Sequence, residues 1–197
     1  MNTEHWEHLL RQWSRAMLRD HDFLPHLAPR HARKHGWLGY DGATEEQMAA
    51  TEARLGVSLP PSYRSFVRVT NGWSQLTSYI YQLWPVESID WFRIKHQGWI
   101  DSWNQAYRTA VPVSDADYFV YGADQYAARF RPAYLPMTVE ISSVEEQAVY
   151  LLNPEVMTSD GEWEAWLLAS WLPGAHRYRS FWELMQAEYA AFVNTRR

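Results

Sequence analysis

The sequence predicts a single α+β domain, in which a mixed, mostly antiparallel β-sheet is covered by α-helices. Helical periodicity occurs near both ends of the chain, over residues 3–19, 44–70 and 180–194. Strand periodicity dominates residues 117–171. The 197 residues contain no repeat and no long linker, so one domain is the economical interpretation.

The first expected helix covers residues 3–19. Its apolar residues fall on one stripe, namely Trp6, Leu9, Leu10, Trp13 and Met17. We expect this helix to pack on the outside of the domain, because such a stripe needs a core to cover it. A free helix that binds a partner is the alternative. Residues 1–40 are therefore interpreted as a helical extension with a connection, and residues 41–197 as the domain.

Two short helices are expected over 44–55 and 61–70. Thr44 and Gln47 have the spacing of a capping box, and Gly56 stands where a left-handed residue ends a helix. The pair Pro60-Pro61 suits the start of the second helix. Nine residues are expected in the core: Leu55, Leu59, Tyr63, Phe66, Val67, Leu151, Leu167, Phe181 and Leu184.

The middle of the chain is expected to supply the sheet. Strands are predicted over 78–86, 117–121 and 133–141. Because of Pro136, the first half of the last strand is expected to be an edge or a bend. A helix that Gly98 could interrupt is expected over 91–107. The continuous apolar run 147–152 predicts a strand buried on both faces, and 162–171 alternates with period two. A last helix begins after Ser180, a natural N-cap.

Several short motifs occur in an order that resembles the SUKH superfamily, in the branch often called Smi/Knr. These motifs are Leu55-Gly56, Leu59-Pro60, Ser62-Tyr63-Arg64, Phe66, Asn71-Gly72, Leu135-Pro136, residues 150–154 (YLLNP), residues 161–166 (GEWEAW) and Ser180-Phe181. The resemblance covers roughly residues 40 to 195. It implies an α+β domain, mostly without enzymatic activity, and many bacterial members neutralise a cognate toxin by binding it.

Composition narrows the possible partners. The formal net charge is −5, which disfavours nucleic acid as a partner and permits a match with a basic protein such as a nuclease toxin. There is no cysteine, and no apolar run approaches the ~20 residues that span a bilayer. The N-terminus is charged and helical rather than a signal peptide, so we expect a cytoplasmic protein without a membrane partner. The twelve tryptophans and twelve tyrosines suit a rigid core or interface anchors.

Catalytic and metal sites have weak support. His31 and His35 are four apart but lack a third converging ligand, so we expect no metal. Glu162 and Glu164 could share a strand face as paired carboxylates of a small hydrolase, although a solvated strand edge is the simpler interpretation. We expect no catalytic residue and no cofactor.

A protein-binding function therefore remains, either immunity to a toxin or a regulatory or scaffold role for a cellular partner. Turns at the ends of a sheet are exposed, so carboxylates and an aromatic residue there could form a polar rim around an anchor. The expected partner-binding residues are Asp115, Asp117, Asp160, Glu162, Trp163, Glu164 and Trp166. Lysines at positions 162 and 164 should then weaken binding while the fold survives.

Overall fold

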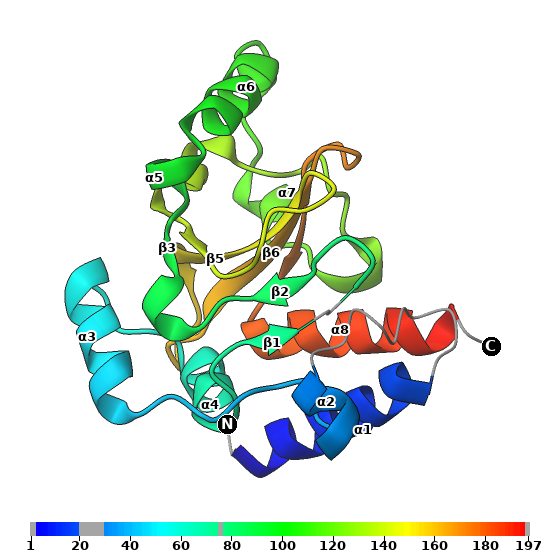
Figure 1. The fold of residues 1–197 in the computed structure, drawn as a ribbon. Coiled ribbons are helices and arrows are strands. Elements are labelled where there is room, and N and C mark those ends of the chain that lie inside the picture. Colours follow the sequence, from blue (N-terminus) through cyan, green and yellow to red (C-terminus); the bar gives the residue numbers. More distant parts are fainter. Residues whose placement is uncertain (1–2, 20–29, 75–76, 196–197) are drawn as a thin grey trace.

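The computed structural model describes residues 3–19, 30–74 and 77–195 (Figure 1). The helices of this part are α1 (Thr3–Arg19), α2 (Arg30–His35), α3 (Glu45–Leu55), α4 (Pro61–Val69), α5 (Phe92–Lys95), α6 (Gln97–Tyr107), α7 (Asp115–Tyr118) and α8 (Phe181–Asn194). The strands are β1 (Trp73–Ser74), β2 (Gln82–Leu83), β3 (Asp90–Trp91), β4 (Val139–Glu140), β5 (Ala148–Met157), β6 (Trp163–Ala169) and β7 (Ala175–Tyr178). Short 3-10 helices cover Val86–Ser88, Gly122–Asp124 and Pro132–Met137.

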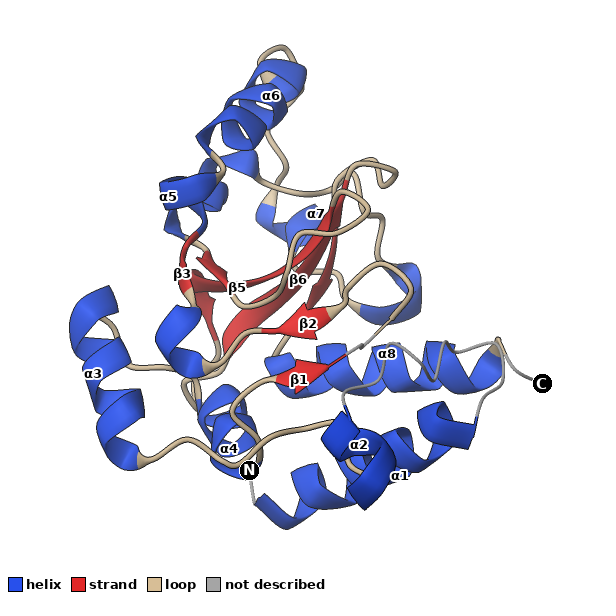
Figure 2. Cartoon of the chain, viewed as in Figure 1, coloured by secondary structure: helices blue, strands red, loops and turns tan. Residues whose placement is uncertain are grey.

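Five strands form one sheet in the order β3-β4-β5-β6-β7, and β1 pairs with β2 in a separate ribbon (Figure 2). Each of the pairings between these named strands is antiparallel. The β5–β6 hairpin runs from Ala148 opposite Ala169 to Asn153 opposite Glu164, and a register shift then places Met157 opposite Trp163. The predicted α+β class is confirmed.

Helices and loops cover the two faces of the sheet. On one face, Tyr150 and Leu152 of β5 belong to the same core as α1, α4 and α8. On the other face, Val149 and Leu151 pack with side chains from the segment 92–135, which contains α5, α6 and α7. This alternation confirms the predicted strand that is buried on both sides, and all nine predicted core residues are buried.

Helix α1 contributes to the core on the α8 face. Its predicted apolar stripe is buried, and the Trp6 ring lies 5.3 Å from Phe66 and 5.5 Å from Phe181, measured between ring centroids. The helix therefore packs on the sheet domain, as expected. The boundary between residues 1–40 and 41–197 stays a prediction. Of the connection expected over residues 25–43, residues 25–29 lie outside the described part, and α2 occupies part of the rest.

The predicted helix ends are confirmed. Thr44 and Gln47 form a reciprocal capping box at α3, and Gly56 ends that helix with a φ of 74°. The Ser180 side chain accepts a hydrogen bond from the backbone N–H of Glu183 at the start of α8. The helix expected over 91–107 is broken between α5 and α6, at His96 rather than at Gly98.

Three predicted strands are wrong or much shorter than expected. Residues 117–121 do not form a strand, because Ser114 caps the short helix α7 by accepting from the N–H of Asp117. Residues 133–137 belong to a 3-10 helix with Pro136 inside it, and only Val139–Glu140 pairs as a strand. In the stretch 78–86, the Thr77 hydroxyl accepts from the N–H groups of Tyr79 and Ile80, so a turn precedes the two-residue β2.

Candidate functional site

Strand β6 carries three of the predicted partner-binding residues and buries all three, and Glu162 directly precedes the strand. Trp163 and Trp166 are buried in the cores on opposite faces of the sheet, and Glu164 is 1% exposed. The two tryptophans are therefore unable to serve as the exposed anchor that the sequence suggested. The reason is that both faces of β6 are covered, whereas period-two alternation alone indicated one solvated face.

Glu162 contacts helix α4 instead of forming a carboxylate pair with Glu164. Its Oε1 accepts from the backbone N–H of Ser62 at 2.8 Å, and its Oε2 accepts from the Ser62 hydroxyl at 2.6 Å. Ser62 stands in the first turn of α4, whose N-cap residue, Pro60, provides no side-chain cap. Partial burial raises the pKa of Glu162, and the hydrogen bonds from Ser62 oppose that rise. Glu162 therefore satisfies one of the orphan backbone donors at the N-terminus of α4.

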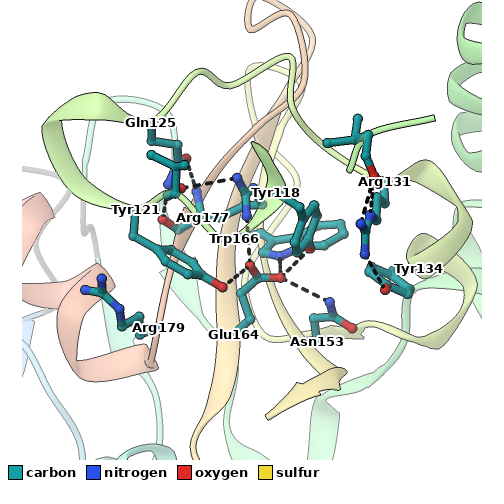
Figure 3. Close-up of polar contacts among 12 residues, drawn as sticks. Tyr118, Tyr121, Gln125, Arg131, Tyr134, Asn153, Glu164, Trp166, Arg177 and Arg179 are labelled. Atoms are coloured by element: carbon teal, nitrogen blue, oxygen red, sulfur yellow. Dashed lines mark hydrogen bonds and ion pairs between the residues drawn. The ribbon is translucent and has the colours of Figure 1, made fainter. Parts of the chain in front are cut away.

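Glu164 lies at the centre of a buried polar cluster (Figure 3). Its Oε1 accepts from Tyr121 Oη at 2.8 Å and from Arg177 Nη1 at 3.2 Å. Its Oε2 accepts from Tyr118 Oη and Trp166 Nε1, both at 2.6 Å, and from Asn153 Nδ2 at 3.2 Å. Five donors from five residues therefore surround one carboxylate, which compensates for its removal from water.

Arg177 and the two tyrosines complete this cluster. The Arg177 side chain is fully buried, and its guanidinium lies 4.1 Å from the Tyr118 ring centroid and 5.3 Å from that of Tyr121. Burial raises the pKa of both tyrosine hydroxyls, and the negative charge of Glu164 raises it further. The hydroxyls therefore stay protonated and donate. The cluster thus fastens the irregular segment 118–125 to β6 and β7.

Gln125 closes part of the free edge of the sheet. Its amide Nε2 donates to the backbone carbonyl of Arg177 at 2.6 Å, and its Oε1 accepts from the backbone N–H of Arg177 at 2.7 Å. The side chain therefore occupies the position that a neighbouring strand would take beside β7. Together with the saturated Glu164 carboxylate, this arrangement is structural and offers no free group for acid–base chemistry.

The exposed predicted residues lie on two separate elements. Asp115 and Asp117 belong to α7, where Asp115 pairs with Arg131 at 2.6 Å and Asp117 accepts from Ser114. Asp160 lies in the turn before β6 and accepts from the Thr158 hydroxyl at 2.5 Å. The expected surface is therefore divided. Sequence reasoning missed the partners of Glu162 and Glu164, and the available signal was a glutamate within a run of apolar strand residues, since buried carboxylates need donors.

Metal and membrane criteria give no further candidate in the described ranges. No group of three or more His, Cys, Asp or Glu residues in those ranges is placed to hold a metal ion. The side chain of His31 lies outside the described part of the chain. None of the helices described is both long enough and apolar enough to cross a bilayer.

Comparison with known proteins identifies the family. Residues 42–185 match the SMI1 / KNR4 family (SUKH-1). The chain matches none of the curated proteins with which it was compared. The family match covers well over half of the 197 residues and includes α3, α4, the five-stranded sheet and the first turn of α8. The chain therefore belongs to the SMI1 / KNR4 (SUKH-1) family.

Proposed function

We propose that this protein is an immunity-type protein that neutralises a cognate bacterial toxin by direct binding, without catalysis, in the cytoplasm. Membership of the SUKH-1 family carries this proposal. The environment of Glu164 supports the non-catalytic part of the proposal. This carboxylate is buried, and its oxygens accept hydrogen bonds that hold the fold together.

Charge supports a basic toxin, such as a nuclease, as the partner. The net charge of the chain is −5, so a basic protein would be attracted over long range. Hydrogen bonds hold acidic groups in their charged form near the β5–β6 turn and α3. The Thr158 hydroxyl lowers the pKa of Asp160, and Arg68 lowers the pKa of Glu45.

The β5–β6 hairpin tip is the part of the predicted surface best suited to contact such a partner. We call Glu155, Met157 and Asp160 the acidic hairpin; all three are exposed, and Met157 is 61% exposed. Met157 takes the place of the expected tryptophan as an apolar contact, since flexible thioether side chains suit binding surfaces. Asp115 contributes less net charge, because Arg131 offsets it.

The test begins with the genes beside this one. The protein should protect cells when co-expressed with a neighbouring toxin gene, and the purified pair should bind. The variant Glu155→Lys with Asp160→Lys should slow association, whereas Asp101→Lys with Asp124→Lys, an equal charge change at exposed sites in segment 92–135, should slow it less. Association should also slow as salt rises, since exposed charges are screened over roughly 10 Å at 0.1 M.

Two outcomes would change the proposal. Unchanged rate constants and unchanged protection in the hairpin variant would exclude the acidic hairpin as the binding surface. If no neighbouring product binds at all, the immunity function gives way to a regulatory or scaffold protein of the same fold that binds a cellular partner.

A further inference from the structure

Three loops meet at the end of the sheet opposite the acidic hairpin. We call residues 77–82, 143–148 and 169–174 the loop-end surface. Ser170 N donates to Gln147 O at 3.0 Å, and Ser143 N donates to Gln82 O at 2.8 Å, so the three loops are joined by their backbones. The turns 145–148 and 170–174 are visible side by side in Figure 1, in yellow and orange.

Aromatic side chains are exposed on this surface. Trp171 is 51% exposed, and Tyr81 is 39% exposed. The Tyr79 ring contacts Trp171 edge to face, with centroids 5.6 Å apart, and Tyr79 Oη donates to the buried Glu188 of α8 at 2.8 Å. Trp171 is therefore supported from below while half of its surface faces solvent, which is typical of a preorganised anchor.

All formal charge on the loop-end surface is negative. Its three loops contain Glu145 and Glu146 and no lysine, arginine or histidine. Neither glutamate forms an ion pair with a described residue. Gln147, the residue next to Glu146, pairs with Ser170, the residue next to Trp171, so the carboxylates and the indole lie on adjoining turns.

We propose that the loop-end surface binds an arginine or lysine side chain presented by a basic polypeptide. A cation is attracted both by the face of an exposed indole and by nearby carboxylates, and arginine can satisfy both at once. This inference does not depend on the proposed toxin, since any basic polypeptide would supply the cation. It also concerns a different end of the sheet from the acidic hairpin.

The test uses a defined probe. A short peptide of alternating glycine and arginine is titrated into the isotope-labelled protein, and backbone amide and indole N–H shifts are followed by NMR. A Trp171→Phe sample assigns the Trp171 indole signal. We expect saturable shifts at Trp171, Glu145 and Glu146, which weaken when citrulline replaces arginine because citrulline has the same shape without the charge.

Matched variants separate this site from general acidity. Glu145→Gln with Glu146→Gln should weaken peptide binding by roughly fivefold or more, and Trp171→Leu should do likewise. Glu155→Gln with Asp160→Asn removes the same charge from the acidic hairpin and should leave binding at the loop-end surface unchanged. Circular dichroism checks that each variant folds. If Trp171→Leu does not fold, the glutamine variants still test the inference.

Three results would overturn the inference. The first is equal weakening by both pairs of charge-neutralising variants, which would indicate unspecific attraction to an acidic protein. The second is equal binding of the citrulline peptide, which would indicate an apolar contact. The third is the absence of saturable shifts at Trp171.

Discussion

Glu162 caps the N-terminus of α4 through Ser62, a residue 100 positions earlier in the chain. Both carboxylate oxygens accept from Ser62, one from its backbone N–H and one from its hydroxyl. A glutamate that the sequence suggested for partner binding thus connects the hairpin turn to the helix. The negative charge also suits the positive end of the helix dipole.

Removal of this cap should destabilise the protein. Glu162→Ala is expected to lower the free energy of unfolding by about 0.5–2 kcal/mol, the range found for lost N-caps. Urea denaturation followed by circular dichroism measures the change. Asp160→Ala, at an exposed position in the same turn, is the control and should cost less. Equal effects of the two substitutions would show that the Ser62 contact contributes little.

The Glu164–Arg177 pair should be far more sensitive than the surface charges around it. Glu164→Ala leaves the fully buried Arg177 without its counter-charge, and breaking a buried pair in this way costs roughly 3–5 kcal/mol. Arg179→Ala, at an exposed arginine 4.9 Å from the Tyr121 ring, is the matched control. Similar denaturation midpoints for both variants would contradict the assigned role.

This burial changes one expectation drawn from the sequence. Lysine at position 164 would place a second cation beside Arg177 in a site that excludes water, so the fold is not expected to survive that substitution. The error came from treating Glu162 and Glu164 as equivalent residues of one solvated face. Tertiary contacts over 100 and 46 residues of sequence, to Ser62 and Tyr118, distinguish them.

Local signals predicted helices α1, α3, α4 and α8 well, because their determinants lie within a few residues. Thr44, Gln47 and Gly56 specify the ends of α3 by contacts inside one turn. The stretch 117–121 failed for the opposite reason. Its tyrosines suggested a strand. In the structure, the hydroxyls of Tyr118 and Tyr121 instead donate to Glu164 on a strand that is distant in sequence. No local pattern reports such a partner.

An exposed tryptophan near carboxylates occurs at a different place from the one that the sequence suggested. An exposed aromatic residue with carboxylates was expected at the start of β6, where Trp163 is buried. Trp171, beyond the end of the same strand, is exposed beside a turn with two glutamates. Both tryptophans fit the same period-two pattern, so only the packing of the surrounding helices and loops separates core from surface.

Truncation of predicted core residues should be costly. Leu55→Ala and Phe66→Ala are each expected to lower the free energy of unfolding by roughly 2–5 kcal/mol, because both side chains lie in the core on the α8 face. Chemical denaturation of each variant tests this. Ile94→Ala, at an exposed apolar position, is the control. An unchanged midpoint in both core variants would refute their assignment to the core.

Gly56 should resist substitution for a conformational reason. A Cβ at this position would have no neighbour within 4 Å, so no side chain would clash. The φ of 74° is nevertheless a region that alanine adopts only at a cost. Gly56→Ala should therefore destabilise by about 1 kcal/mol, whereas Gly98→Ala, inside α6 and without a positive φ, should be neutral or stabilising. Thermal unfolding of the two variants gives the comparison.

Glu188 of α8 should make stability depend on pH in an unusual direction. The residue is buried; it accepts a hydrogen bond from Tyr79 and interacts with Tyr150 and Tyr178. Burial raises the pKa of Glu188 above its ordinary value of 4.5, although Tyr79 and Tyr150 oppose the rise. At pH values between 4.5 and the higher pKa of the folded state, the folded protein binds more protons at this site than the unfolded chain does. The contribution of Glu188 to stability is therefore lost as pH rises from about 4.5 through the higher pKa of the folded state.

Glu188→Gln should remove this dependence, because the amide is neutral at every pH and can still accept from Tyr79. Relative to the wild type, the variant should gain stability as pH rises, by about 1.4 kcal/mol for each tenfold rise in the proton affinity of the folded state over the unfolded chain. Urea denaturation at a series of pH values above and below 4.5 measures the difference. Glu155→Gln, at an exposed carboxylate, is the control and should show no such trend. A difference between Glu188→Gln and wild type that stays constant with pH would mean that Glu188 has the same proton affinity in both states, and would contradict the effect assigned to its burial.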